Sequence, residues 1–221
     1  IMLESTKRIA LIAALAMATT FVAQQGHAEE RVGDPYTLDT CPVSGAKLDS
    51  KGEPIVLVLD GREVKFCCAG CKPQFEADSA TFLSKIDAKV IEQQKKFYPI
   101  ETCIVGEGKL GSMGEPLDLV VNNRHVRLCC AGCEKKLKAD PAPFIAKLDK
   151  AVIAAQSKTY NLKECPISGE TLNSNALNVV VGNRLVKICC AGCESKVLSK
   201  TSKIFAMLDS GKVEAEGSDS K

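Results

Sequence analysis

The pentapeptide CCAGC occurs three times in this chain, at residues 67–71, 129–133 and 189–193. A further cysteine precedes each copy, so the chain contains three similar units with four cysteines apiece. The cysteines of the successive units are Cys41, Cys67, Cys68 and Cys71; Cys103, Cys129, Cys130 and Cys133; Cys165, Cys189, Cys190 and Cys193. Surface positions differ between the units while every cysteine is kept, which indicates that the units share one cysteine-dependent property.

The tyrosines give the period of the repeat. Tyr36, Tyr98 and Tyr160 lie 62 residues apart, at the start of the related phrases YTLDTC, YPIETC and YNLKEC. A fixed internal period is typical of a repeat architecture. We therefore predict the following segments: a signal peptide at 1–28, cysteine-rich repeats at 29–97, 98–159 and 160–211, and a disordered tail at 212–221.

The first segment has the pattern of a signal for export. Lys7 and Arg8 precede an apolar run of 15 residues, and small residues at Gly26 and Ala28 resemble a cleavage site. The run is shorter than the ~20 residues that span a bilayer as a helix, so we expect no stable membrane span after cleavage. The prediction is a periplasmic or secreted protein, a location in which thiols are not kept reduced by default.

Composition narrows the class of protein. Of the 221 residues 45% are hydrophobic and the formal net charge is +2, which is typical of a globular chain and gives no reason to expect nucleic acid as a partner. Twelve cysteines against two histidines are the strong deviation, and they indicate disulfides or soft-metal binding. No catalytic triad, phosphate loop or carboxylate pair stands out, so we predict that the protein is not an enzyme.

Each unit has the same predicted local structure. The turn PVSG or PISG follows the first cysteine in two units, and two short apolar runs follow in all three. Between the runs lie Asp-Gly, Asn-Asn or Gly-Asn pairs, which favour the tight turn of an antiparallel hairpin. A short helix and a longer amphipathic helix are predicted after CCAGC. The predicted fold class is α+β: three tandem small units, each with a cysteine turn, a β-hairpin and one or two helices.

The predicted helix start suggests how the cysteines converge. If CCAGC begins a helix, Cys67 and Cys71 are at i and i+4 and Cys68 is three residues before Cys71, so all three lie near one face. A helix N-terminus also favours thiolates, the form that binds metal. Cys41, 26 residues before Cys67, can fold back over the hairpin to meet them. Three or four converging thiolates are typical of a tetrahedral soft-metal site.

This order of a cysteine, a hairpin and a C-x3-C motif resembles the TRASH and YHS metal-binding modules. Cys41, Cys67 and Cys71 match their three-cysteine pattern, as do the equivalent cysteines of the other units. The resemblance covers nearly all of residues 36–210 and implies a treble-clef-like fold that binds heavy or transition metals. The chain departs from the pattern where these modules often have a second cysteine, a position that here holds Ser44, Gly106 and Ser168. It also has an additional cysteine at 68, 130 and 190.

Two alternatives to metal binding remain open from the residues. Four cysteines per small unit could form two stabilising disulfides outside the cytoplasm. Against this, adjacent Cys67 and Cys68 pair with each other only in a strained ring. The second alternative is a thiol–disulfide oxidoreductase that uses Cys68 and Cys71 as a C-x2-C pair, although that motif follows a hairpin here and not the strand of a βαβ unit.

The function that these observations favour is binding of one soft metal ion per unit, by a metal chaperone, buffer or sensor. Copper(I) and zinc are the expected ions, and mercury and cadmium suit the same all-sulfur ligands. Within the first unit we expect Cys41, Cys67 and Cys71 to be the primary ligands, with Cys68 as a fourth ligand or a spare. His125, on a predicted strand, is expected to be exposed and without a role in binding.

Overall fold

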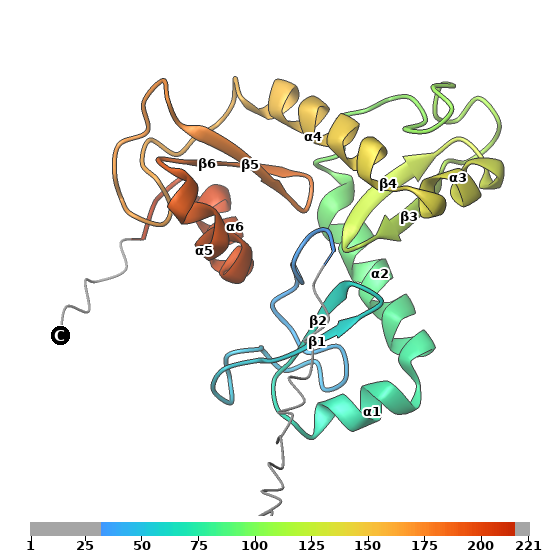
Figure 1. The fold of residues 1–221 in the computed structure, drawn as a ribbon, viewed down its shortest axis with the longest axis horizontal. Helices are drawn as coiled ribbons and strands as arrows, with labels where there is room; N and C mark the ends of the chain where they lie inside the picture. The colour runs from blue at the N-terminus through green and yellow to red at the C-terminus, as the bar shows by residue number, and fades with distance from the viewer. Residues whose placement is uncertain (1–31, 215–221) are drawn as a thin grey trace, which may run out of the picture.

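The computed structural model describes residues 32–214, and the predicted signal peptide at 1–28 and the end of the predicted tail lie outside this range. Within it the protein is α+β, with three two-stranded antiparallel hairpins, six α-helices and two short 3₁₀ helices. Figure 1 shows the three units following one another along the chain, each hairpin accompanied by its own helices. The described part contains no helix with the length and apolarity needed to cross a membrane.

The order of elements is the same in each unit. The first unit comprises β1 (Ile55–Leu59), β2 (Arg62–Phe66), α1 (Cys71–Ala77) and α2 (Ser79–Lys95). The second comprises β3 (Leu117–Val121), β4 (Arg124–Leu128), η1 (Ala131–Cys133), α3 (Glu134–Ala139) and α4 (Ala142–Gln156). The third comprises β5 (Leu177–Val181), β6 (Arg184–Ile188), η2 (Ala191–Cys193), α5 (Glu194–Ser199) and α6 (Thr201–Ser210).

The three hairpins turn at the dipeptides that the sequence predicts. Both residues of each turn have a left-handed backbone, with φ between 49° and 75° at Asp60 and Gly61, Asn122 and Asn123, and Gly182 and Asn183. Turns with positive φ at both central residues match the right-handed twist of the flanking strands, so they hold the register of a two-residue hairpin. That register decides which residue ends the second strand, and therefore where each CCAGC motif begins.

Each hairpin is tied to the long helix of its own unit by an arginine that follows the turn. Arg62 is 2.6 Å from Asp87 on α2, Arg124 is 3.0 Å from Asp149 on α4, and Arg184 is 2.7 Å from Asp209 on α6. Each ion pair is partly shielded by packing, since the arginine side chains are at most 13% exposed. The repeated pair fixes the angle between hairpin and helix in every unit.

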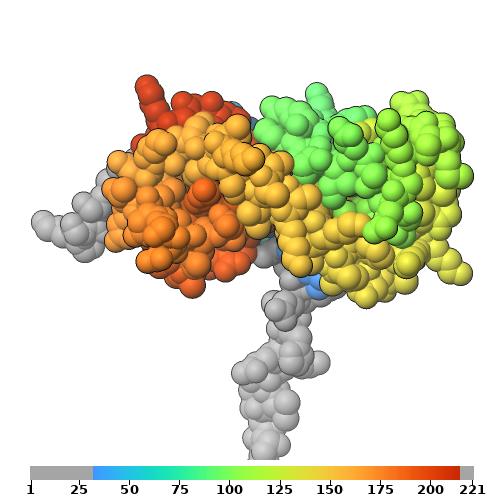
Figure 2. Space-filling view, turned by 90° about the horizontal axis from the view of Figure 1, so that it is seen from above, coloured from blue at the N-terminus to red at the C-terminus, as the bar shows by residue number. Residues whose placement is uncertain are grey.

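Successive units are joined by a glutamine near the end of the long helix. Gln94 on α2 donates to the backbone oxygen of Asn123 at 2.9 Å and accepts from the backbone N–H of His125 at 2.8 Å. Gln156 on α4 makes the same two bonds, both 2.8 Å long: it donates to the backbone oxygen of Asn183 and accepts from the backbone N–H of Leu185. In both joints the helix of one unit satisfies the backbone of the next hairpin turn. Figure 2 shows residues 142–156 spanning the boundary between the second and third units.

The segment before the first cysteine reaches all three units. The carboxylate of Asp34 accepts two hydrogen bonds from the buried guanidinium of Arg124, at 2.8 and 3.0 Å, and a third from the N–H of Gly182. Gly33 makes this approach sterically feasible, because a Cβ there would lie 2.5 Å from the Cβ of Asn122. A charged residue of the first unit therefore links the turns of the second and third hairpins.

Every unit has its own hydrophobic core, and the cysteines belong to it. In the first unit the fully buried Phe66, Phe75 and Ile86 belong to the same packed cluster as Cys41 and Cys67. The cores of the other units likewise contain their first cysteines, Cys103 and Cys165, at 0% exposure. Each cysteine cluster is thus embedded at the edge of a packed core.

Candidate metal centres

The first cysteine of each unit is held by a short hydrogen-bonded turn. The oxygen of Cys41 accepts from the N–H of Gly45 at 2.9 Å, and the N–H of Cys41 donates to Ala46 at 2.8 Å. The equivalent pairs of bonds surround Cys103 and Cys165. These turns direct several backbone N–H groups toward the sulfur, as when Gly106 donates to the Cys103 Sγ at 3.3 Å.

The CCAGC motif does not begin a helix at its first cysteine, and this part of the sequence prediction is wrong. α1 begins at Cys71, and in the second unit even the 3₁₀ turn begins after Cys130, whose backbone is extended with φ −163° and ψ 166°. β2 ends at Phe66, so Cys67 and Cys68 lie in the bend between the strand and α1. A turn then brings the last cysteine back, with the N–H of Cys71 donating to Cys68 at 3.2 Å.

Three sulfurs of each unit nevertheless come together. In every group the Sγ atoms lie within 4.8 Å of one another. The groups are Cys41, Cys67 and Cys71; Cys103, Cys129 and Cys133; and Cys165, Cys189 and Cys193. These are the cysteines expected as primary ligands, and the structure places them as three equivalent candidate centres, one per unit.

The fourth cysteine of each unit lies beside the group without joining it. Cys68 Sγ is 3.7 Å from Cys71 Sγ, Cys190 Sγ is 3.7 Å from Cys193 Sγ, and Cys130 Sγ is 3.9 Å from Cys129 Sγ. None of the three is within 4.8 Å of all members of its group. The fourth thiol is also never buried.

The first cysteine of each group is predisposed to be a thiolate. Burial raises the pKa of Cys41, but hydrogen bonds from the backbone and hydroxyl of Ser44 and from the backbone of Cys67 outweigh burial and lower this pKa to about 6. The same balance between burial and backbone hydrogen bonds lowers the pKa of Cys103 and of Cys165 to about 7. Near neutral pH each cluster therefore carries negative charge before any cation arrives.

The last cysteine of each group behaves oppositely. Burial, reinforced by hydrogen bonding with the neighbouring thiols, raises the pKa of Cys71 to about 12. Burial and hydrogen bonding with Cys103 raise the pKa of Cys133 to about 12, and the pKa of Cys193 is raised for the same reasons. A cation that binds three sulfurs must displace these protons, so binding is coupled to proton release.

Residues that are not ligands also contact the sulfurs. The hydroxyl of Ser44 is 3.2 Å from the Sγ of Cys67, and the hydroxyl of Ser168 is 3.3 Å from the Sγ of Cys189. The second unit has Gly106 at this position. In the sequence this position departs from the resembled modules, and the difference in residue type between the units is the only signal there of its contact with the sulfurs.

His125 is not exposed as expected from the sequence. Its side chain is fully buried, with Nε2 2.8 Å from the carboxylate of Asp118 and the ring 5.5 Å from that of Tyr98. The joint between the first two units covers it, because Gln94 binds its backbone. This histidine belongs to the packing between units and lies outside the cysteine groups.

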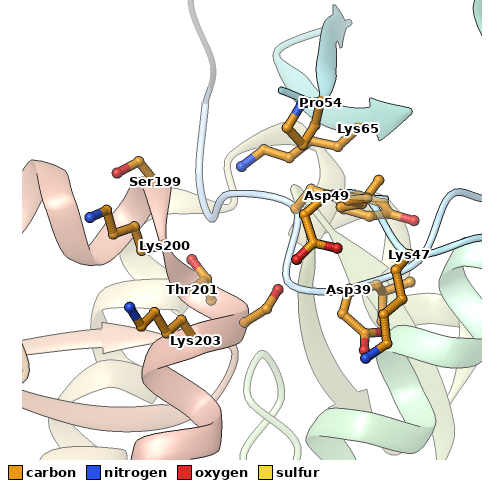
Figure 3. A pocket seen from close by; sticks show the side chains of 13 residues that line it. Asp39, Lys47, Asp49, Pro54, Lys65, Ser199, Lys200, Thr201 and Lys203 are labelled. Carbon is orange, nitrogen blue, oxygen red and sulfur yellow. The ribbon is translucent and has the colours of Figure 1, made fainter. Parts of the chain in front are cut away.

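A hollow between the first and third units lacks the character of a binding centre. Figure 3 shows this cavity of about 480 Å³, in which Lys47, Lys65 and Asp49 of the first unit face Lys200 and Lys203 of the third. Its lining mixes both signs of charge and contains none of the cysteines. The chemistry that the three units share lies in the sulfur groups and not in this cavity.

All twelve cysteines lie within the described residues, and all are free thiols. Three sulfurs that face one point form a donor set suited to soft ions such as copper(I), zinc, cadmium and mercury. The arrangement of the residues present therefore fits a metal ion in each unit. Comparisons with protein-family models, curated proteins and solved structures find no match to this chain.

Proposed function

We propose that each unit binds one soft transition-metal ion, copper(I) or zinc, through its group of three cysteines, and that the chain is an exported metal chaperone, buffer or sensor. The observation that carries this proposal is the threefold recurrence of three Sγ atoms within 4.8 Å of one another. One such group could arise from core packing alone. Three groups with the same order of turn, strand end and helix start are better explained by a common ligand.

The charge of the clusters supports the proposal. A first cysteine with a pKa of about 6 or 7 supplies a thiolate near neutral pH, which attracts a cation and is itself a ligand. The last cysteines Cys71 and Cys133, whose pKa is raised to about 12, remain protonated without a cation. A bound ion would replace their protons and remove the cost of placing three thiols together at the edge of a core.

The resemblance to TRASH and YHS modules is part of the same proposal. We infer a treble-clef-like unit, since a cysteine turn, a hairpin and a helix start supply the ligands in the order that the resemblance implies. Export is likewise proposed from the basic and apolar residues of the predicted signal peptide. No protein partner is implied by these features.

The decisive experiment is elemental analysis combined with a free-thiol count, on protein purified anaerobically from its native compartment. We expect up to about three copper or zinc ions per chain, one for each cysteine group, with thiols that become titratable after chelation. Protein without metal and without titratable thiols would instead support the disulfide-stabilised module.

Thiol–disulfide exchange is a second candidate, favoured by one observation. Cys68 and Cys71, and equally Cys190 and Cys193, have their sulfurs 3.7 Å apart, and the first cysteine of each pair is accessible. Exchange with a disulfide substrate would oxidise this pair to a disulfide and release the substrate as a dithiol. Catalytic reduction of a model disulfide or oxidation of a model dithiol, lost in Cys68→Ser with Cys190→Ser, would favour this candidate over metal binding.

A further inference from the structure

We propose that the second unit holds its ion with one coordination position open to an external thiolate, whereas Ser44 and Ser168 close that position in the first and third units. This inference rests on the proposed metal binding and assigns different roles to the three centres. The second centre would exchange metal with incoming thiols, and the outer two would retain it.

The side chain at this position points onto the face formed by the three sulfurs. A Cβ built on Gly106 would lie 3.3 Å from the Sγ of Cys133, 3.9 Å from that of Cys103 and 4.0 Å from that of Cys129. A group attached there approaches all three ligands at once. The residue at 106 therefore decides whether that face of the centre is covered.

In the other two units a fixed hydroxyl lies at the corresponding place. The Oγ of Ser44 accepts from the N–H of Ala46 at 3.3 Å and lies 3.2 Å from the Sγ of Cys67. Ser168 repeats this arrangement, with the N–H of Glu170 and the Sγ of Cys189 each at 3.3 Å. A thiolate can only accept, so the hydroxyl donates to sulfur when a metal is bound and does not compete as a ligand.

The cysteine beneath Gly106 is open to solvent. Gly106 itself is exposed, and the Cys133 beneath it is partly exposed. The equivalent cysteines, Cys71 and Cys193, are buried at 5% and 6% exposure. In the third unit the partly exposed cysteine is Cys189, and the hydroxyl of Ser168 contacts its sulfur at 3.3 Å. The second unit therefore combines an accessible sulfur with the lack of a hydroxyl neighbour.

Turn geometry does not account for the glycine. The left-handed position of this turn is the next residue, which is Gly45 in the first unit and Gly169 in the third, with φ of 72° and 73°. In the second unit that strained position holds Glu107, with φ of 60°, while Gly106 occupies a position outside the left-handed region. The glycine is therefore placed where it opens the cluster and not where the backbone needs it.

The open position suits a thiolate because an ion that prefers three sulfur ligands prefers a fourth of the same kind. Zinc in particular completes a tetrahedron, and a protein site with three ligands characteristically takes its fourth from outside. Cys130 is the internal competitor. Its Sγ lies 3.9 Å from Cys129 and 3.7 Å from a Cβ built on Gly132, outside the three-sulfur group.

The test uses the full chain loaded with cobalt(II), whose sulfur charge-transfer and d–d bands report each added thiolate. We expect glutathione to change the spectrum with a saturation point of about one equivalent per chain, since one centre is open. Gly106→Ser should abolish the change. Ser44→Gly, the matched control in the first unit, should raise the saturation point to about two equivalents while the cobalt content stays the same.

Each other outcome is informative. A chain that binds no cobalt contradicts the proposed metal binding itself. A cobalt-loaded chain that takes no thiol, or takes the same amount with Gly106→Ser, contradicts only the open position. A response that appears in Cys130→Ser but not in the unaltered protein means that Cys130 fills the position, which also overturns the inference. A short peptide with one cysteine distinguishes the thiol's source: a response equal to that of glutathione indicates a centre open to protein thiolates, and no response restricts it to small thiols.

Discussion

The second unit and the two outer units use the same scaffold to gather three sulfurs, yet they surround those sulfurs differently. Serine hydroxyls contact the clusters of the outer units, while Gly106 leaves the second cluster uncovered. The second unit also buries a histidine where the third has Leu185. The comparison teaches that the cysteines determine where an ion would bind, and that neighbouring residues which are not ligands determine how each centre behaves.

Metal removal should produce the largest loss of stability. The loss should be common to all three units because the core of each unit contains its own cysteine cluster. Structural zinc contributes on the order of 10 kcal/mol to the folding free energy of small domains. After chelation the units should therefore be largely unfolded at physiological temperature, and the cooperative melting transition should disappear. Circular dichroism melts with and without chelator measure this, and hydrogen exchange reports each unit separately. An unchanged melt, with the thiols found oxidised, would contradict metal stabilisation.

The next largest effect should be the loss of metal affinity when a cysteine of a three-sulfur group is replaced. This loss should distinguish ligand cysteines from the neighbouring fourth cysteine. Cys71→Ser should weaken binding at the first centre by more than about 100-fold, since changes to mere supporting residues of metal sites cost about 10–100-fold. Cys68→Ser should cost much less, because its sulfur lies outside the group. Competition with a metal indicator in the full chain gives both values.

The control is the same pair of changes in the second unit, Cys133→Ser and Cys130→Ser. Equal losses within a pair would mean that all four thiols bind the ion. A greater loss with Cys68→Ser than with Cys71→Ser would contradict the three-cysteine centre and favour the thiol–disulfide candidate.

The joints between units should differ in strength because they are buried to different degrees. Gln94 is fully buried and Gln156 is only partly so, although both bind the turn of the next hairpin. Gln94→Ala leaves a backbone N–H and a backbone oxygen unpaired at about 1–3 kcal/mol each, so we expect a loss of roughly 2–6 kcal/mol in unfolding free energy. Gln156→Ala should cost less. Urea denaturation, with exposed Glu92→Ala as the control, tests this order; a larger loss for Gln156→Ala would contradict it.

The smallest effect should be a pH dependence that the second unit alone acquires from His125. Burial lowers the pKa of His125 below its ordinary value of 6.5, so the unfolded chain takes up a proton first as the pH falls, and stability is lost below about pH 6.5. His125→Leu introduces the leucine that the third unit has at the equivalent position. Between pH 7.5 and 5.5 the variant should lose about 1 kcal/mol less unfolding free energy than the unaltered protein.

Urea midpoints of the two chains at both pH values make this measurement, with the same metal content in each sample. The cysteine centres titrate in both chains alike, so the difference between the chains isolates the histidine. Parallel pH profiles would show that His125 is already free to take up a proton in the folded state.

Much of each unit follows from local sequence patterns. The period of the repeat, the hairpins and their turn residues are all visible in the sequence, because strand alternation and the need for positive φ act over a few residues. The three groups of cysteines were also foreseeable, since a turn cysteine and a cluster at the strand end are brought together by any closed hairpin. The fold class α+β follows from the same patterns.

The helix start at CCAGC could not be read correctly from spacing. Positions i and i+4 meet on a helix, but Cys67 and Cys68 lie in a bend after β2 and α1 begins only at Cys71. Convergence at a turn and convergence on a helix face predict the same ligands, so the correct cysteines were identified with the wrong backbone. The difference matters for Cys68, whose sulfur is 3.7 Å from that of Cys71 but outside the group.

The repeat, the hairpins and the cysteines that could act follow from the order of residues alone, because they depend on residue type and short-range backbone preference. Tertiary structure alone decided that Gln94 and Gln156 join the units, that Asp34 reaches Arg124, and that His125 is buried. Those contacts link residues about 30 to 90 positions apart, and their free energy depends on excluding water from polar groups that only the packed chain brings together.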